Sequence, residues 1–96
     1  MIWYFIDGKS FQLFERLIEL IGDKHSDISF IYRVMFQDKF IHEQSESEFR
    51  NWLELESDFH ISITKLQQLY HVETNNRKTI YLQTLEQFQL TSKTYS

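Results

Sequence analysis

The sequence predicts a small α+β domain, in which two helices pack on a single-layer antiparallel sheet. Three patterns support this prediction: a hydrophobic run over residues 2–6, an amphipathic helical pattern over residues 10–21 and an alternating pattern over residues 28–36. The chain of 96 residues suffices for one core and is too short for two. We therefore expect a single domain over residues 1–90, followed by a frayed polar tail over residues 91–96.

The turn pair Asp7–Gly8 separates the first two elements. The run before it is typical of a short buried strand, because all of its residues are hydrophobic. In the run after it, hydrophobic residues fill one half of a helical wheel and polar residues share the other, which predicts a helix with one buried face. We expect Asp7 or Ser10 to cap the start of this helix and Gly22 to lie at its end.

The third element is a predicted strand over residues 28–36. Alternate residues from Ile28 to Phe36 are hydrophobic, whereas the apolar side chains of this segment scatter all round a helical wheel. The polar residues 37–39 offer a turn, and residues 40–42 follow it with further hydrophobic side chains. This arrangement predicts a β-hairpin.

A second helix is predicted to begin after Ser45, which forms a capping box with Glu48. The hydroxyl of Ser45 is expected to accept a hydrogen bond from the backbone at Glu48, and the carboxylate of Glu48 to reach back. Phe49 and Trp52 contribute to the apolar face of this helix, which is expected to fray near residues 57–58.

The C-terminal third is compatible with two structures. Residues 60–64 alternate like a strand, and the polar residues 73–77 suit the loop of a second hairpin. The same region also fits a pair of helices, because Ile63 and Leu66 begin a helical spacing of hydrophobic residues. In that alternative the fold is all-α, with a helix-turn-helix-like arrangement over residues 63–90.

The sequence contains no signature of an enzyme, a cofactor site or a metal site. Without cysteine there is no thiol nucleophile and no thiolate zinc site, and two glycines leave no room for a phosphate-binding loop. Asp58, His60 and Ser62 have the side chains of a hydrolase triad, but on a strand they would stand about 6 to 7 Å apart, beyond hydrogen-bond reach. Four histidines lack the spacing of neighbouring metal ligands; they are His25, His42, His60 and His71. We therefore expect no catalysis, no cofactor and no metal.

These features predict a small non-enzymatic binding module that acts by occupying a macromolecular partner, with a protein favoured. Inhibitors and regulators of this size are typical of phages and mobile elements. The segment of residues 43–58 is acidic, and the side chains expected to contact the partner are Glu46, Glu48, Glu54 and Glu56. On a regular helix these carboxylates cannot share one face, so a merely solvated acidic surface is the competing interpretation.

The alternative function is that of a DNA-binding transcriptional regulator. The chain as a whole has a net charge of −4, but the region after residue 62 carries an excess of basic side chains. In a helix-turn-helix-like arrangement, Asn76, Arg77 and Lys78 would contact phosphates or base edges.

We also expect a homodimer, because 42% of the residues are hydrophobic and the predicted strands are apolar on both faces. The interface is expected to include aromatic side chains from the set Trp3, Tyr4, Phe30 and Tyr32. The sequence shows no secretory signal and no apolar run of about 18 residues, so the expected location is the cytoplasm, without membrane association.

Overall fold

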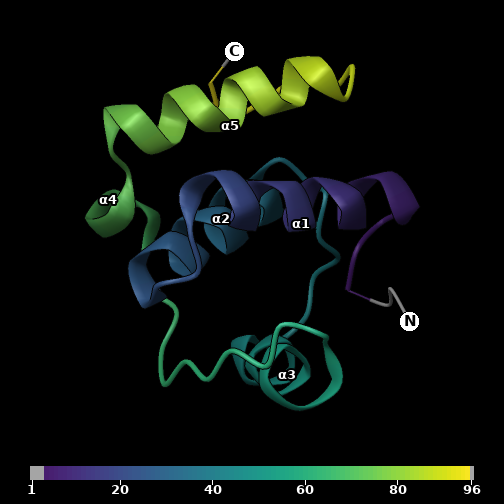
Figure 1. Cartoon of the computed structure of the whole chain (residues 1–96), viewed down its shortest axis with the longest axis vertical. Coiled ribbons are helices and arrows are strands. Elements are labelled where there is room, and N and C mark those ends of the chain that lie inside the picture. The colour runs from purple at the N-terminus through teal and green to yellow at the C-terminus, as the bar shows by residue number, and fades with distance from the viewer. Residues whose placement is uncertain (1–3, 96) are drawn as a thin grey trace.

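The computed structural model describes residues 4–95, and the regular secondary structure in this range is helical (Figure 1). The elements in order are α1 (Gly8–Ile21), α2 (His25–Gln37), α3 (Glu46–Asn51), the π-helical turn η1 (Trp52–Glu56), α4 (Leu69–Val72) and α5 (Asn75–Gln87). The strand-type pairing within residues 4–95 is a single antiparallel bridge between Phe5 and Ile41. The predicted α+β fold with a sheet is therefore wrong, and the all-α alternative fits.

Helix α1 has the predicted caps. The Asp7 carboxylate accepts a hydrogen bond from the backbone N–H of Ser10 at 2.8 Å. Gly22 ends the helix with φ 134° and ψ 177°, a backbone conformation that is essentially restricted to glycine. Leu17 is fully buried as expected, but Leu20 is 41% exposed and lies outside the core. Figure 1 shows α1 between α5 and α3.

Helix α2 replaces the strand predicted over residues 28–36. Its buried residues are Asp27, Ile28, Ser29, Phe30, Ile31, Tyr32, Val34 and Met35. A helix that is covered on nearly all sides has no continuous polar face, so its sequence loses the 3.6-residue period. The apolar side chains that scatter around the helical wheel of residues 28–36 therefore indicate a helix buried on nearly all sides, and not a strand.

The first predicted hairpin is also absent. The chain does turn after α2, where Lys39 has φ 68°, and the N–H of Phe40 still donates to the carbonyl of Met35, but residues 40–42 then pair with residues 4–6 and form no strand ladder with residues 28–36. The N–H of Ile6 donates to the carbonyl of Phe40 at 3.1 Å, and the N–H of His42 donates to the carbonyl of Tyr4 at 2.9 Å. The strand predicted over residues 2–6 is thus reduced to one bridge in its described part, and residues 2 and 3 lie outside the described residues.

The C-terminal third forms two helices in place of the second hairpin. Residues 60–68 contain no helix or strand, and they lead into the four-residue α4 and then α5. The part of the expected frayed tail that the structure describes is docked: Ser92 and Thr94 donate hydrogen bonds to the buried carboxylate of Asp38.

The core is rich in aromatic side chains; it lies among α1, α2 and α3–η1 and includes Val72 of α4 and Tyr81 and Leu85 of α5. The indole of Trp52 is at its centre, and its ring centroid lies 5.5 to 6.4 Å from those of Tyr4, Phe5, Phe11, Phe14 and Phe49. Tilted and edge-on contacts of this kind add to the free energy of burial. The core therefore fixes the orientation of α3–η1, the most acidic element of the chain.

Candidate protein-binding surface

The acidic element α3–η1 begins with the Ser45 half of the predicted capping box. The Ser45 hydroxyl accepts a hydrogen bond from the backbone N–H of Glu48 at 3.2 Å. The helix then widens, because the N–H of Ser57 donates to the carbonyl of Trp52, five residues earlier, at 2.8 Å. The Ser57 hydroxyl also donates to the carbonyl of Leu53 at 2.6 Å and so closes the end of the turn. Single π-helical turns of this kind are frequent at functional sites.

This geometry divides the element into a buried side and an exposed side. Phe49 and Leu53 are fully buried, whereas the side chain of Leu55 is 69% exposed. The exposed acidic residues of the element and the loop after it are Glu48, Glu54, Glu56 and Asp58. An exposed leucine is thus surrounded in the sequence by carboxylates, on an element that the core holds in place.

The structure separates the four acidic residues that were predicted to contact a partner. Glu46 forms an ion pair with Arg33, which gives it a structural role. Burial raises the pKa of the Tyr4 hydroxyl, and the negative charges of Glu56 and Glu48 raise this pKa further, which indicates that both carboxylates lie near Tyr4. Glu54 is exposed on the same element. Three of the four carboxylates therefore remain available to a partner.

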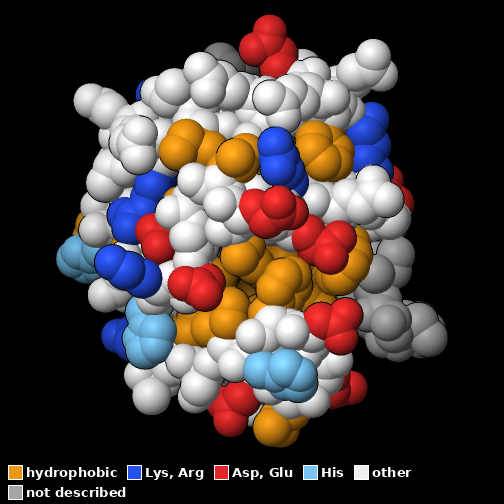
Figure 2. Space-filling view, viewed as in Figure 1, with side chains coloured by type: hydrophobic (Ala, Val, Ile, Leu, Met, Phe, Trp, Pro, Cys, Tyr) orange, Lys and Arg blue, Asp and Glu red, His pale blue; other side chains and the backbone are white. Residues whose placement is uncertain are grey.

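A hydrophobic hollow lies next to this element. Figure 2 shows hydrophobic side chains gathered between α1 and α3, with Asp and Glu side chains around them. The half-buried hydrophobic residues that α1 and the segment after η1 place against the core are Phe11, Ile18, Ile21, Phe59 and Ile61. We call the hydrophobic area between α1 and α3 in Figure 2, which these two segments flank, the acid-rimmed hollow.

Helical geometry explains how α1 contributes to the hollow. Phe11, Phe14 and Ile18 follow one another at spacings of three and four residues, so they lie along one side of the helix. The ring of Phe59 packs on this side, with its centroid 5.7 Å from that of Phe14. Sequence patterns assigned the α1 residues to the core. They gave no signal for Phe59 and placed Ile61 in an alternating, strand-like stretch, whereas the segment of residues 60–68 has no regular structure.

Of the three residues predicted to contact DNA, two make contacts within the chain and the third is exposed. The side chain of Arg77 is only 18% exposed, and its guanidinium donates to the Asp27 carboxylate and the Ser26 hydroxyl, each at 2.8 Å. The ammonium of Lys78 lies 4.8 Å from the ring centroid of Tyr95. Asn76 is exposed. Because Arg77 holds α5 against α2, it is not presented to a nucleic acid.

The aromatic residues predicted for a homodimer interface are mostly inaccessible. Phe30 and Tyr32 are buried inside the chain, where they contact other core rings. Tyr4 is half-buried, and Trp3 lies outside the described residues. The buried pair therefore cannot contribute to an interface in this fold.

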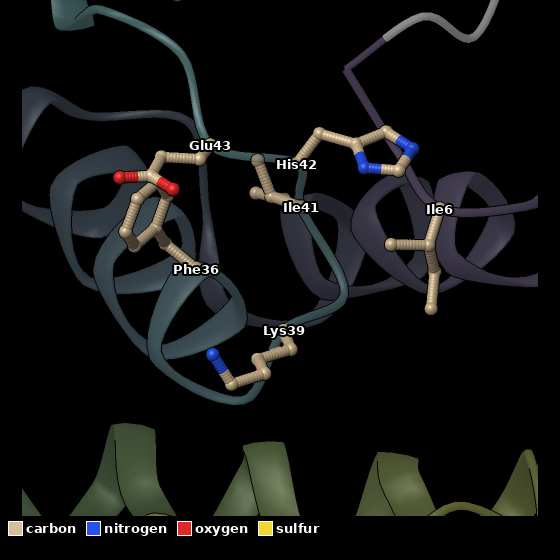
Figure 3. A pocket seen from close by; sticks show the side chains of 6 residues that line it. All are labelled: Ile6, Phe36, Lys39, Ile41, His42 and Glu43. Carbon is tan, nitrogen blue, oxygen red and sulfur yellow. The ribbon is translucent and has the colours of Figure 1, made fainter.

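A separate hollow of about 330 Å³ lies beside the bridge between Phe5 and Ile41 (Figure 3). Its lining residues are Ile6, Phe36, Lys39, Ile41, His42 and Glu43. In Figure 3 the side chains of Lys39, His42 and Glu43 point in different directions. Because these groups do not converge on one point, this hollow is a weaker candidate.

Comparison with known proteins adds no assignment: no family model, no curated protein and no solved structure matches this chain. Among residues 4–95, no three acidic or histidine side chains are grouped so that they could hold a metal ion. In the same range, no helix has the length and apolar character needed to cross a membrane.

Proposed function

We propose that this chain is a small non-enzymatic module that binds a protein partner through the acid-rimmed hollow and the exposed Leu55 of η1. The observation that carries the proposal is a hydrophobic area of half-buried side chains with carboxylates around it (Figure 2), together with the exposed Leu55 on the neighbouring η1. Hydrophobic patches bordered by polar residues are typical of protein interaction sites. Protein interfaces have the same anatomy, with an apolar centre and a polar rim.

The charges of this surface indicate the chemistry of the partner. Exposed carboxylates on η1 and the following loop come from Glu54, Glu56 and Asp58, and the whole chain has a net charge of −4. A partner that places a hydrophobic side chain in the hollow and lysines or arginines around it would match both features. Such complementary charges speed association and reject partners of the wrong sign.

The test compares variants in affinity capture from a lysate of the organism that encodes the chain. Leu55→Ser removes an exposed hydrophobic side chain, and Glu56→Lys reverses one charge of the border. Leu20→Ser is the matched control, because Leu20 is also exposed but lies on the opposite edge of α1 from Ile18. All three variants should keep the melting temperature of the wild type within a few degrees.

We expect one or more proteins to be captured by the wild type and by Leu20→Ser, and to be reduced about tenfold or more by Leu55→Ser and by Glu56→Lys. Binding of the purified partner should then weaken as the salt concentration rises. If Leu55→Ser and Glu56→Lys retain the same proteins as the wild type, in the same amounts, the exposed side of η1 is not part of the binding site and the proposal in this form is wrong.

A further inference from the structure

A second surface lies on the segment that leads into α4. It is a polar hollow of about 520 Å³, lined by Lys65, Gln67, Gln68, Tyr70 and His71. We call it the α4 hollow. It shares no residue with the acid-rimmed hollow, and its lining contains two basic side chain types and no carboxylate.

The backbone under the α4 hollow is held in place although it is not helical. Arg33 donates from its guanidinium to the carbonyls of Leu66 and Gln67, each at 2.9 Å. The N–H of Gln67 donates to the Ser29 hydroxyl at 3.0 Å. From α3, Arg50 donates to the carbonyl of Thr64 at 2.9 Å. These bonds fix an irregular segment before any ligand arrives, which lowers the entropic cost of binding.

The side chains of the α4 hollow form an aromatic surface beside polar groups. The side chain of Tyr70 is 77% exposed, and its ring centroid lies 4.2 Å from that of His71. An exposed aromatic ring offers a face on which a planar ligand can stack. Lys65 supplies a positive charge, and the amides of Gln67 and Gln68 can each donate and accept hydrogen bonds.

We infer that the α4 hollow binds a nucleotide, with the base stacked on Tyr70 and the phosphate near Lys65. Stacking on an aromatic side chain, a cation for the phosphate and amides for the edge of the base are the elements of single-stranded nucleic acid recognition. The nucleotide can come from two sources, a free mononucleotide or one unit of a single strand. A duplex does not fit, because its bases are already stacked and paired.

The test is a titration of the full chain with a fluorescently labelled single-stranded oligothymidylate, followed by anisotropy. We expect saturable binding, and Tyr70→Ala should weaken it on the order of tenfold, as loss of one stacked base does. Tyr70→Phe keeps the ring and should retain the wild-type affinity. Lys65→Ala should make the slope of log affinity against log salt shallower by about 0.7, the value for one phosphate contact on a single strand.

Lys9→Ala is the matched control, because it removes the same charge from an exposed position on α1 and should change neither affinity nor slope. A parallel titration with thymidine monophosphate, followed by NMR, distinguishes the sources: binding of the monophosphate with the affinity of the strand assigns a free nucleotide, and binding of the strand alone assigns a nucleic acid. The inference is wrong if neither ligand saturates, if Tyr70→Ala binds like the wild type, or if duplex DNA binds as tightly as the single strand. Lysate capture by the Leu55 variants is independent of all these outcomes.

Discussion

The two ends of the chain are held to the fold by different forces. The N-terminal part, from α1 to η1, is packed through rings such as those of Phe14, Phe49 and Trp52. The C-terminal part also buries Tyr81 and Leu85, and in addition it is bound to two carboxylates, Asp27 in the first turn of α2 and Asp38 directly after that helix. Asp27 accepts from Arg77, and Asp38 accepts from Tyr81, Ser92, Thr94 and the backbone N–H of Lys93.

This difference determines how each part responds to change. Burial of hydrophobic area is not directional and does not depend on the protonation of a side chain. A buried carboxylate with many donors is directional, and loss of its charge or of a single atom leaves several polar groups unsatisfied. We therefore expect the N-terminal part to lose stability when a polar group is placed in its core. The C-terminal part should lose stability when a buried carboxylate is protonated or replaced by an amide.

The largest effect should come from Leu17→Asp in the N-terminal core. Leu17 is fully buried, and a carboxylate there would have no partner, at a cost of several kcal/mol that the marginal stability of a small domain cannot absorb. We expect loss of the cooperative thermal transition in circular dichroism. Glu15→Lys, on the other side of α1, should melt like the wild type. A Leu17→Asp variant with a wild-type melting curve would contradict the assignment of this face to the core.

The next largest effect should come from Asp38→Asn, which replaces one acceptor oxygen by a donor amide that faces donors. We expect a loss of about 2 to 4 kcal/mol in the free energy of unfolding at neutral pH, measured by urea denaturation. Asp23→Asn alters an exposed carboxylate and should change this free energy by less than about 0.5 kcal/mol. Equal stabilities of the two variants would show that the tail contributes little.

The effect of Asp38 should also depend on pH. Burial raises the pKa of the Asp38 carboxyl, but the hydrogen bonds from Ser92, Thr94 and Tyr81 outweigh burial and lower the pKa below its usual value. Because the folded pKa is below the unfolded one, the carboxylate stabilises the fold above the usual aspartate pKa of about 4. This contribution is lost as the pH falls through the depressed folded pKa. The stability difference between wild type and Asp38→Asn should therefore shrink below about pH 4.

A smaller effect is expected at Gly22, which lies against Asp27, the carboxylate that joins α2 to Arg77 of the C-terminal part. A Cβ atom at this position would lie 2.4 Å from Oδ2 of Asp27, the carboxylate that also binds Arg77, and the φ of 134° is itself strained for alanine. Gly22→Ala should thus cost about 1 to 3 kcal/mol in unfolding free energy. Gly8→Ala is the control: no atom lies within 4 Å of its added Cβ, and alanine favours the helix by up to about 1 kcal/mol. If both variants are stabilised, Asp27 moves freely and does not link the two parts.

The elements that sequence could predict are those with one buried side. α1 has a clear polar half and recognisable caps, and α3 begins at a capping serine. α2 was mistaken for a strand because burial on nearly all sides removes the helical period. In α5 the buried residues are only Tyr81, Thr84 and Leu85, and its attachment through Arg77 cannot be read from hydrophobic spacing. Polar contacts between distant residues leave no periodic signal.

The candidate surfaces were predictable to a similar degree. The acidic composition of residues 43–58 identified the element, but it did not show which carboxylates are paired within the chain. Glu46 forms an ion pair with Arg33, thirteen residues earlier. A wheel drawn for a regular α-helix also misplaces residues beyond Trp52, because the π-helical turn changes their direction. The α4 hollow depends on arginines that reach across 13 to 34 residues to hold its backbone, so no local pattern could indicate it.

The attachment of the tail to Asp38 has a consequence for protein synthesis. The side-chain donors on Ser92 and Thr94 lie 54 and 56 residues after Asp38, so they leave the ribosome long after the helix that needs them. Until residue 94 has been added and released, the nascent chain carries a carboxylate with too few donors. A product that stops near residue 90 would contain all of the helices and still remain incompletely folded, which would expose it to proteases that remove unfinished chains.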